Sequence, residues 1–522
     1  MGEGILHFYQ TKLQKEYKIA FISTFLTSLI IHLYKFANTL PHHDSIRNYY
    51  STQFLPSHGR WALSWACGIS SYYDLPWVIG LISCVFIALT TIVIVALFKM
   101  KNPILIGLTG ALLAASPATT ETFFFLYTAD GYMIAMFLSS LAVYLSRIEE
   151  KRISRLILSG VLICISCGIY QSYVSFALLL AVCYFMDTLF DNQHDKKDYL
   201  QWILRQIIIY SLSLVTYYLI WKLSIRFSDA AITSYQGISE VGKLTPDLLI
   251  TGMFRSIKAT FLYFLQWNVF EHGFTLYSIL NILFFISMAG ILVFISFKSG
   301  IFKRRWAAFL FLLCLVAIIP FACMWNFTTD SIKYRAIMFQ SFTLLFILTA
   351  LLYEKWSKTA VKNSICLLLI LIVFHNSLMA NISYFYMNLS YERTYADGLE
   401  MMIDIHNLQD THEFDKIAVI GHRFTEMSFQ NKHIDKETNE ITPFGKIYVL
   451  SARFEKSMLY EPALVTQFLT ATFGLDLEPL DHEQQKELSE TPAVKAMGCW
   501  PADDSITVID DTLVLKLADT PE

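Results

Sequence analysis

Charged residues are scarce in this chain of 522 residues: Asp, Glu, Lys and Arg make up 16% of it, whereas 55% is apolar. The mean hydropathy is accordingly positive, at +0.47. A soluble protein needs more charge than this to cover its surface, so the composition excludes a soluble domain that carries a single membrane anchor. It predicts a polytopic α-helical membrane protein whose apolar surface faces lipid.

The chain also lacks several familiar site motifs. It contains no GxGxxG, no Walker loop and no HExxH, which are the usual signals for a nucleotide or a catalytic zinc ion. Most of the nine cysteines lie inside apolar stretches, where they behave as small hydrophobic residues, and this holds for the C-x-x-C pair Cys164 and Cys167. No metal or other cofactor is predicted. The first apolar run is too long for a cleavable signal peptide, so none is expected.

Apolar stretches long enough to cross a bilayer recur along the chain, and their number is about eleven. In chain order they cover residues 19–38, 77–98, 103–118, 132–146, two stretches joined by the GIYQSY turn at 168–173, 207–225, 275–297, a ninth that ends at Trp325, 335–353 and 363–383. The segment 226–271 is amphipathic around Arg255 and Lys258. It predicts an interfacial anchor, with a lid as the alternative.

The loops between these stretches differ in charge. Those on one side are short and rich in Lys and Arg, whereas those on the other side are longer and carry fewer basic residues. The positive-inside rule therefore predicts a cytoplasmic amino terminus and an extracytoplasmic carboxyl terminus. The polar clusters considered below all fall on the predicted outer face.

Charged residues become frequent after about residue 391 and remain so to the end of the chain. We therefore expect a transmembrane part, residues 1–390, and a folded extracytoplasmic α/β domain, residues 391–522. Alternating apolar residues predict strands at 416–420, 446–450 and 506–515, the last folded into a hairpin across Asp510 and Asp511. Helical patterns lie at 397–407 and 481–488.

The polar stretch at 40–61, between the first two apolar spans, contains His42, His43, Asp44 and Arg60 among aromatic residues. A carboxylate flanked by imidazoles and guanidiniums beside a membrane span is a candidate for acid–base chemistry on an anionic, membrane-borne substrate. Ordinary loop residues at a headgroup interface are the alternative. In either case the loop is expected to be exposed to water.

Three further polar groups lie at the outer ends of spans: Glu121 with Asp130, Tyr170 with Gln171, and Lys333 with Arg335. Ionisable residues at membrane depth are costly unless they face a cavity or pair with each other. Glu121 and Asp130 bracket an FFFLY run, so both can line one outer cavity, and hydration at the interface is the alternative. Arg335 suits a phosphate contact, because a guanidinium donates two parallel hydrogen bonds.

Several motifs together resemble one family. They are the aspartate of the first external loop, Gly59-Arg60-Trp61, the TADGY and GIYQSY turns, and the closing CWPADDSITVIDDTLVLKL. The chain is similar over nearly its whole length to the bacterial glucosyl transferase II family, whose members modify O-antigen and related surface glycans. The resemblance implies a GT-C-like fold and an inverting hexosyltransferase of the bacterial cytoplasmic membrane. Its donor would be a polyprenyl-phosphate sugar and its acceptor a surface polysaccharide, among membrane lipids and without nucleic acid.

The resemblance also implies roles for individual residues. Asp44 would be the catalytic base, Arg60 and Arg335 would contact the phosphate, and the remaining substrate-binding residues would be Glu121, Asp130, Tyr170 and Gln171. Many GT-C enzymes have two adjacent acids where this chain has two histidines and Asp44, which speaks against a metal-dependent scheme.

Two alternatives belong to other functional classes. A transporter or flippase would show charged residues in mid-span and repeated halves with broken helices, and no internal repeat is found. A glycan polymerase would use a diphosphate-linked oligosaccharide, and the sequence separates it poorly from a transferase.

Overall fold

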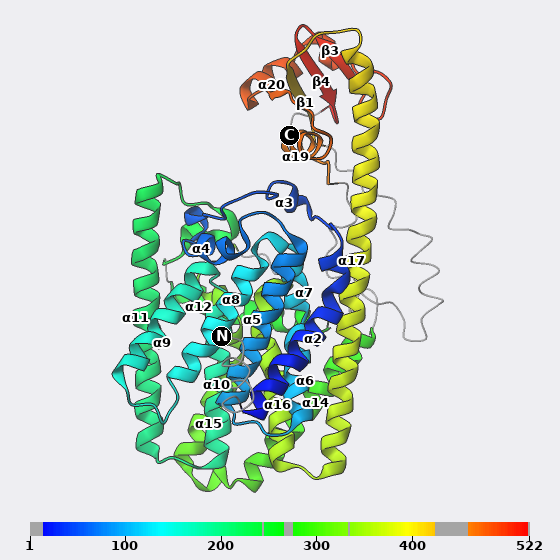
Figure 1. The fold of residues 1–522 in the computed structure, drawn as a ribbon. Helices are drawn as coiled ribbons and strands as arrows, with labels where there is room; N and C mark the ends of the chain where they lie inside the picture. Colours follow the sequence, from blue (N-terminus) through cyan, green and yellow to red (C-terminus); the bar gives the residue numbers. More distant parts are fainter. Residues whose placement is uncertain (1–13, 243–244, 266–274, 332–334, 423–457, 520–522) are drawn as a thin grey trace, which may run out of the picture. The chain divides into compact units, whose positions relative to one another are not determined.

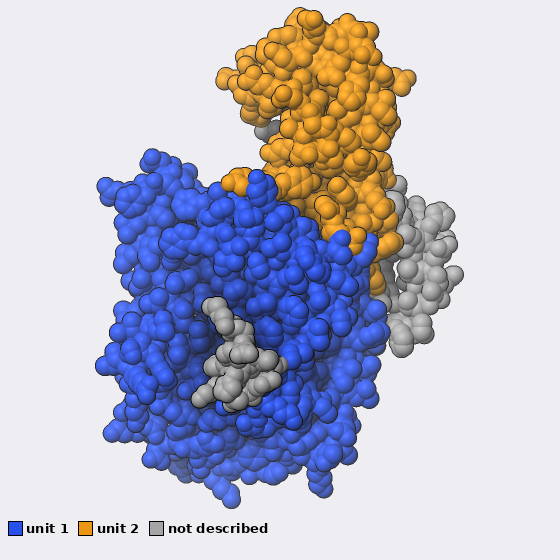
Figure 2. All heavy atoms as spheres, in the orientation of Figure 1, with its two compact units in different colours: residues 1–37, 51–381, 444–450 blue, residues 38–50, 382–443, 451–522 orange. Residues whose placement is uncertain are grey.

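The computed structural model describes residues 14–242, 245–265, 275–331, 335–422 and 458–519. The chain divides into two compact units, which Figure 2 shows in different colours. Of the described residues, unit 1 contains 14–37 and those between 51 and 381, and unit 2 contains 38–50, 382–422 and 458–519. The loop after the first apolar span is thus shared between the units, since residues 38–50 group with the carboxyl-terminal part of the chain.

Unit 1 is built from helices (Figure 1), which satisfy their backbone polar groups internally, as a lipid environment requires. Its elements are α2 (Lys15–Ala37), η1 (Pro56–His58), α4 (Leu63–Cys67), η2 (Gly68–Ser70), α5 (Pro76–Leu97), α6 (Pro103–Ala114), α7 (Pro117–Phe124), η3 (Leu126–Thr128), α8 (Ala129–Leu145), α9 (Ile153–Ile169), α10 (Tyr173–Asp191), α11 (Lys196–Ser228), η4 (Tyr235–Glu240), α12 (Pro246–Leu265), α14 (Leu276–Lys298), η5 (Ile301–Lys303), α15 (Arg305–Ala322), η6 (Met324–Phe327), η7 (Ala336–Phe342), α16 (Thr343–Trp356) and the first part of α17 (Thr359–Gln409).

Among the described residues, 10 helices are long and apolar enough to cross a membrane, or up to 11 if α6 and α7, bent by 42° at their junction, form one span. This confirms the predicted polytopic helical fold. Helix α9, with 17 residues, is not among these helices, although it lies where a span was predicted.

Helix α12 differs from its prediction, because it is long and apolar enough to cross a membrane where an interfacial anchor was expected. Its buried positions Leu248, Gly252, Ser256 and Ala259 recur every three or four residues, but its exposed residues include large apolar side chains. Arg255 is turned inward, and its Nη2 donates to the carbonyl of Asn326 at 2.9 Å. Small residues lie mainly on the packed side of the helix, and large apolar residues lie on its exposed side. This distribution is compatible with helix packing in lipid as well as with an interfacial helix.

Helix α17 joins two elements that were predicted separately, a span at 363–383 and a helix at 397–407, into one helix of 51 residues. No proline interrupts residues 359–409, so no backbone hydrogen bond is lost along them. Its residues up to 381 belong to unit 1, and those from 382 belong to unit 2.

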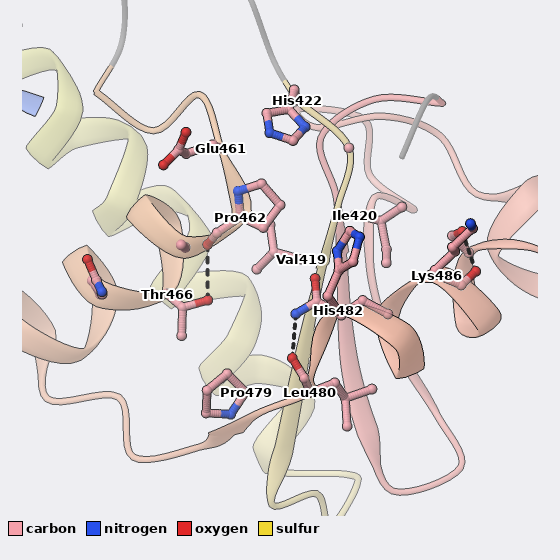
Figure 3. A pocket seen from close by; sticks show the side chains of 15 residues that line it. Val419, Ile420, His422, Glu461, Pro462, Thr466, Pro479, Leu480, His482 and Lys486 are labelled. Carbon is pink, nitrogen blue, oxygen red and sulfur yellow. Dashed lines mark hydrogen bonds between the residues drawn. The ribbon is translucent and has the colours of Figure 1, made fainter. Parts of the chain in front are cut away.

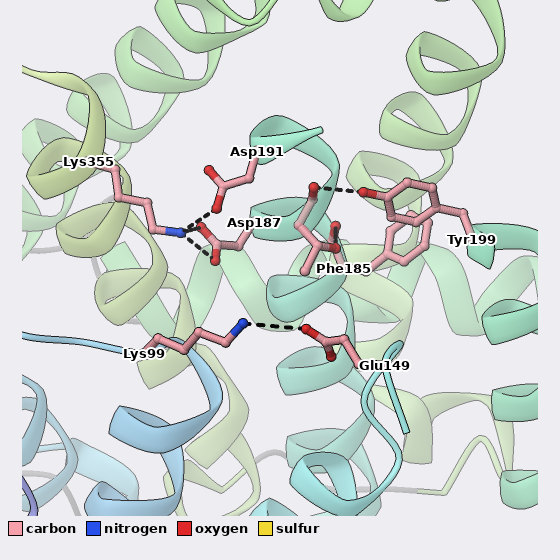
Figure 4. A network of polar contacts seen from close by, with 8 residues as sticks. Lys99, Glu149, Phe185, Asp187, Asp191, Tyr199 and Lys355 are labelled. Carbon is pink, nitrogen blue, oxygen red and sulfur yellow. Dashed lines mark hydrogen bonds and ion pairs between the residues drawn. The ribbon is translucent and has the colours of Figure 1, made fainter. Parts of the chain in front are cut away.

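Acidic residues of α10 hold a lysine of α16 (Figure 4). The Lys355 ammonium lies 2.6 and 2.7 Å from the carboxylate oxygens of Asp187 and 3.0 Å from Asp191. Asp187 is buried, and a buried carboxylate is tolerated when a cation neutralises it. This network ties α10 to α16 near the ends of both helices.

Unit 2 contains a four-stranded sheet in the order β2–β1–β4–β3. Its strands are β1 (Lys416–Ile420), β2 (Glu478–Pro479), β3 (Ile506–Ile509) and β4 (Thr512–Lys516). Strand β1 runs parallel to β2 and β4, whereas β3 and β4 form an antiparallel hairpin, which confirms the predicted turn at Asp510 and Asp511. The strand predicted at 446–450 lies outside the described residues.

Helices cover both faces of β1, because successive side chains of a strand point to opposite faces. Ile417 and Val419 pack against α19 (Pro462–Phe473), which lies in the larger core cluster of the unit. Ala418 and Ile420 pack toward α20 (His482–Ser489) and α21 (Pro492–Ala496) on the other face. Helix α3 (His43–Ile46) also belongs to this unit, and its Ile46 joins the larger cluster.

The number of spans predicts where the carboxyl terminus lies. With an odd number of crossings and a cytoplasmic amino terminus, a reporter fused after Glu522 should be active only outside the cytoplasm. Paired alkaline phosphatase and green fluorescent protein fusions measure this directly. A cytoplasmic signal would contradict the prediction and indicate an even number, as when both α9 and α12 cross.

Candidate active site

A tight turn fixes Arg60 at the end of η1. Gly59 has a φ of 73°, in the left-handed region that favours glycine. Trp221 Nε1 donates to the carbonyl of Pro56 at 2.7 Å, and Tyr217 Oη donates to the carbonyl of Gly59 at 3.0 Å. Gln171 Nε2 donates to the carbonyl of His58 at 2.8 Å. Gln171, predicted to bind substrate, thus supports the turn that carries Arg60.

The Arg60 guanidinium lies against two tyrosine rings. Its Nη1 donates to Tyr132 Oη at 2.9 Å, and its central carbon lies 4.9 Å from the centroid of Tyr170. The two rings are stacked, with centroids 4.4 Å apart. A cation over aromatic faces is stabilised electrostatically, and more so when water is excluded. The structure therefore brings together the predicted residues Arg60 and Tyr170.

No carboxylate lies within 4.0 Å of the Arg60 side chain among the residues that the structure describes, and Arg60 Nε is buried there without a hydrogen-bond partner. A charge that is withdrawn from water and lacks a counter-ion is costly. Such a guanidinium is ready to bind an anion, and phosphate matches its planar donor geometry.

His58 also lies close to this guanidinium. Burial and the positive charge of Arg60 both lower the pKa of His58 from its ordinary value, which favours the neutral ring. Its Nδ1 lies 3.0 Å from Ser57 Oγ.

Glu121 and Arg335 also lie in one region. Glu121, on α7, is buried, and its carboxylate accepts from the backbone N–H of Ile337 at 2.6 Å. Arg335 immediately precedes η7, close enough to Glu121 for an electrostatic interaction, and its guanidinium carbon lies 5.6 Å from the centroid of Phe125. Lys333 lies outside the described residues.

Asp130 points to different neighbours. It is fully buried at the start of α8, accepts from the N–H of Gly131 at 2.8 Å, and contacts the side chains of Ser70 and Cys67. These contacts fasten α4 and η2 to α8. Although Asp130 and Glu121 were expected to line one cavity, their hydrogen-bond partners lie on separate elements.

Asp44 lies in unit 2, where two histidines flank its carboxylate. Asp44 Oδ2 lies 3.6 Å from His42 Nδ1, and Oδ1 lies 3.4 Å from His43 Nε2. The side chain of Asp44 is 36% exposed, whereas His42 and His43 are buried. Arg47, three residues later, forms an ion pair with Glu461.

The expectation that this loop is exposed to water is therefore wrong for the residues around Asp44. The physical reason is Ile46, an apolar residue in a polar stretch, which packs into the core of unit 2. Asp44 itself keeps enough exposure to exchange a proton.

The same three residues form a group of potential metal ligands. One ligand atom from each of His42, His43 and Asp44 lies within 4.8 Å of the others. Imidazole and carboxylate are ligand types that suit zinc and related ions. As the geometry stands, the histidines orient the carboxylate.

The region that contains these residues matches the family model of Glucosyl transferase GtrII, over residues 33–353. This is more than half of the chain. The chain belongs to the GtrII family. The match confirms the resemblance to this family over residues 33–353, which include every candidate residue from Asp44 to Arg335, whereas its extension to the closing motif of the chain stays a prediction. Membership of the GtrII family implies a glucosyltransferase that modifies a surface glycan. Comparison of the chain with curated proteins and with solved structures gave no match.

Sequence reasoning missed the aromatic residues that hold Arg60 and its turn. Tyr132 is the last residue of the TADGY motif, so its motif was noticed although its role was not. Tyr217 and Trp221 lie four residues apart on α11, which puts them on one face of that helix. Two large polar aromatic residues at this spacing in an apolar helix are a signal that both contact a polar segment.

The turn before Arg60 predicts the effect of Gly59→Ala. An added Cβ would lie 2.5 Å from Tyr217 Oη and 2.6 Å from Gln171 Nε2. The left-handed conformation alone costs roughly 1–2 kcal/mol with a side chain, and the displaced partners add to this. We expect a lower melting temperature and reduced glucose transfer.

Gly300→Ala is the matched control. Gly300 also has a positive φ, of 64°, but its nearest contact from an added Cβ is 3.7 Å away, at Lys303. Equal losses of stability and transfer in the two variants would contradict the role given to the contacts of Gly59.

Proposed function

We propose that this GtrII family member transfers glucose, or a similar hexose, from a polyprenyl-phosphate donor to a surface glycan on the outer face of the bacterial cytoplasmic membrane. One observation carries the proposal of the donor. The Arg60 guanidinium is held by Tyr132 and Tyr170 without a carboxylate within 4.0 Å among the described residues. A positioned cation of this kind in a glucosyltransferase is suited to the phosphate of a membrane-borne donor.

The number of charges favours a monophosphate. One guanidinium can stabilise the charge that develops on the phosphate oxygen as it leaves, without the divalent ion that a diphosphate usually needs. The charge of Arg335 is offset in part by Glu121, which interacts with it electrostatically, so Arg60 is the cation without a carboxylate within 4.0 Å among the described residues. The apolar helices surround the prenyl chain.

Asp44 acts as the general base in this proposal. It takes the proton of the acceptor hydroxyl while the oxygen attacks the anomeric carbon from the face opposite the phosphate. The new glycosidic bond forms as the bond from the anomeric carbon to the phosphate oxygen breaks, and its electron pair leaves with polyprenyl phosphate. The configuration at the anomeric carbon is thereby inverted. His42 and His43, at 3.6 and 3.4 Å, fix the orientation of the carboxylate.

Arg60→Gln tests the donor site. Glutamine keeps hydrogen-bonding groups but removes the charge, and a charged hydrogen bond contributes about 1.5–3 kcal/mol, so KM for the donor should rise on the order of tenfold to a hundredfold. Arg152→Gln, at an exposed arginine, is the control. Steady-state glucose transfer with varied polyprenyl-phosphate glucose measures both. An unchanged KM in a folded Arg60→Gln protein would refute the assignment.

Asp44→Asn tests the base. Asparagine preserves the size of the side chain but cannot take the proton, so turnover should fall on the order of 10²-fold or more while donor binding changes little. Transfer and the melting temperature are measured together, because His42 and His43 are buried beside this residue. Asp476→Asn, at an exposed aspartate of the same unit, is the control.

Three other outcomes would count against Asp44 as the base. Near-normal transfer by a folded Asp44→Asn protein would move the role to Glu121 or Asp130. Loss of the folded state would make the aspartate structural. Transfer that a chelator abolishes and manganese restores would assign His42, His43 and Asp44 to a metal ion instead.

A further inference from the structure

A pocket of about 490 Å³ lies in unit 2, at the carboxyl ends of the parallel strands β1 and β2 (Figure 3). Gly421 and His422 follow β1 at its edge, and Leu480 follows β2. Helix α19 forms one side through Pro462 and Thr466, and α20 forms the other side through residues that include His482 and Lys486. All of these residues lie beyond position 353, so membership of the GtrII family does not assign the pocket a role.

The position in the sheet favours ligand binding. In open α/β sheets, ligands bind in the crevice outside the carboxyl ends of parallel strands, where helices on the two faces begin. Helices α19 and α20 both start at this edge. Among the described residues, the N-cap Glu461 makes no capping hydrogen bond to the N–H groups of α19, so the positive end of this helix is not neutralised by its own cap.

The described lining of the pocket contains one lysine, Lys486, and one carboxylate. The one lining carboxylate among the described residues, Glu461, is paired with Arg47. Lys486 has no carboxylate within 4.0 Å in the described part of the chain, and nearby Glu490 is itself held by Lys495 at 2.5 Å. The Lys486 ammonium, together with hydrogen bonds from the rings of His422 and His482, can stabilise a negative charge.

The other lining groups suit hydroxyls and C–H surfaces. Gln467 and Ser489 offer hydrogen bonds, while Val419, Pro479 and Leu480 form apolar patches. A mixed lining of this kind and a volume of a few hundred Å³ are typical of sites for small molecules.

We propose that this pocket binds an anionic sugar, meaning a monosaccharide or disaccharide with a phosphate or carboxylate group. The anionic group lies against Lys486, His482 and the start of α19. The sugar hydroxyls contact the polar side chains, and the ring lies along the apolar patches. The proposal rests on the lining of this pocket alone, and therefore not on the proposed donor or base.

Calorimetric titration of the full-length protein in detergent tests this, with glucose 6-phosphate, glucuronate, glucose and inorganic phosphate as probes. At least one anionic sugar should bind about tenfold or more tightly than glucose and than inorganic phosphate, because charged and hydroxyl contacts act together. Comparing glucose 6-phosphate with glucuronate shows whether phosphate or carboxylate is the natural anion.

Two variants locate the site. Lys486→Gln should weaken binding about tenfold or more, because it removes a charged hydrogen bond. Ala463→Phe, at an exposed lining position, should block the pocket without disturbing the core. Lys416→Gln is the matched control, since Lys416 is a half-buried lysine at the opposite end of β1, paired with Asp511.

The outcomes separate clearly. Glucose that binds as tightly as both anionic sugars would overturn the anionic assignment, and inorganic phosphate that binds as tightly would overturn the sugar assignment. Absence of binding, or binding that neither Lys486→Gln nor Ala463→Phe weakens, would overturn the pocket. No lipid donor is present, so these results do not depend on whether the proposed transfer occurs.

Discussion

The positive charge of Arg60 is the constraint on which this part of unit 1 depends. A half-buried guanidinium must be held by groups that stabilise it, and here they come from separate parts of the chain. Tyr132 stands on α8 and Tyr170 at the end of α9, while Tyr217 and Trp221 of α11 secure the turn from which the side chain extends. Polar aromatic residues from several helices thus contact this one cation or support the turn that carries it.

Several other charged side chains in the protein have oppositely charged or polar partners. Lys355 is surrounded by Asp187 and Asp191, Glu121 accepts from backbone N–H groups, and Asp130 contacts small polar side chains. Each of these groups has its partners within the protein and serves to join helices. Arg60 differs from them, because aromatic rings stabilise its charge and no carboxylate lies within 4.0 Å among the described residues, which is the basis on which we propose it as a substrate contact.

The elements with a strong local signal could be predicted from the sequence. Hydropathy identified α5 and α14, alternation identified the β3–β4 hairpin, and the GRW motif identified Arg60. The prediction was less successful where one sequence pattern is compatible with two structures. Helix α12 is an example, because its stripe of small residues gives the same amphipathic pattern as an interfacial helix. Contacts between distant residues could not be foreseen at all. Asp130 turning toward Ser70 is one case, and Ile46 packing with Met401 is another.

The packing of α3 has a consequence for the order of events during synthesis. Ile46 is made roughly 350 residues before Met401 and still earlier than Val465, its companions in the core of unit 2. At about 5–20 residues per second, the ribosome needs some 20–70 s to supply the first of these partners. During that interval the segment with His42, His43 and Asp44 has no core to pack into. The loop that contains the proposed base is therefore among the first parts of the protein to be translated and among the last to mature.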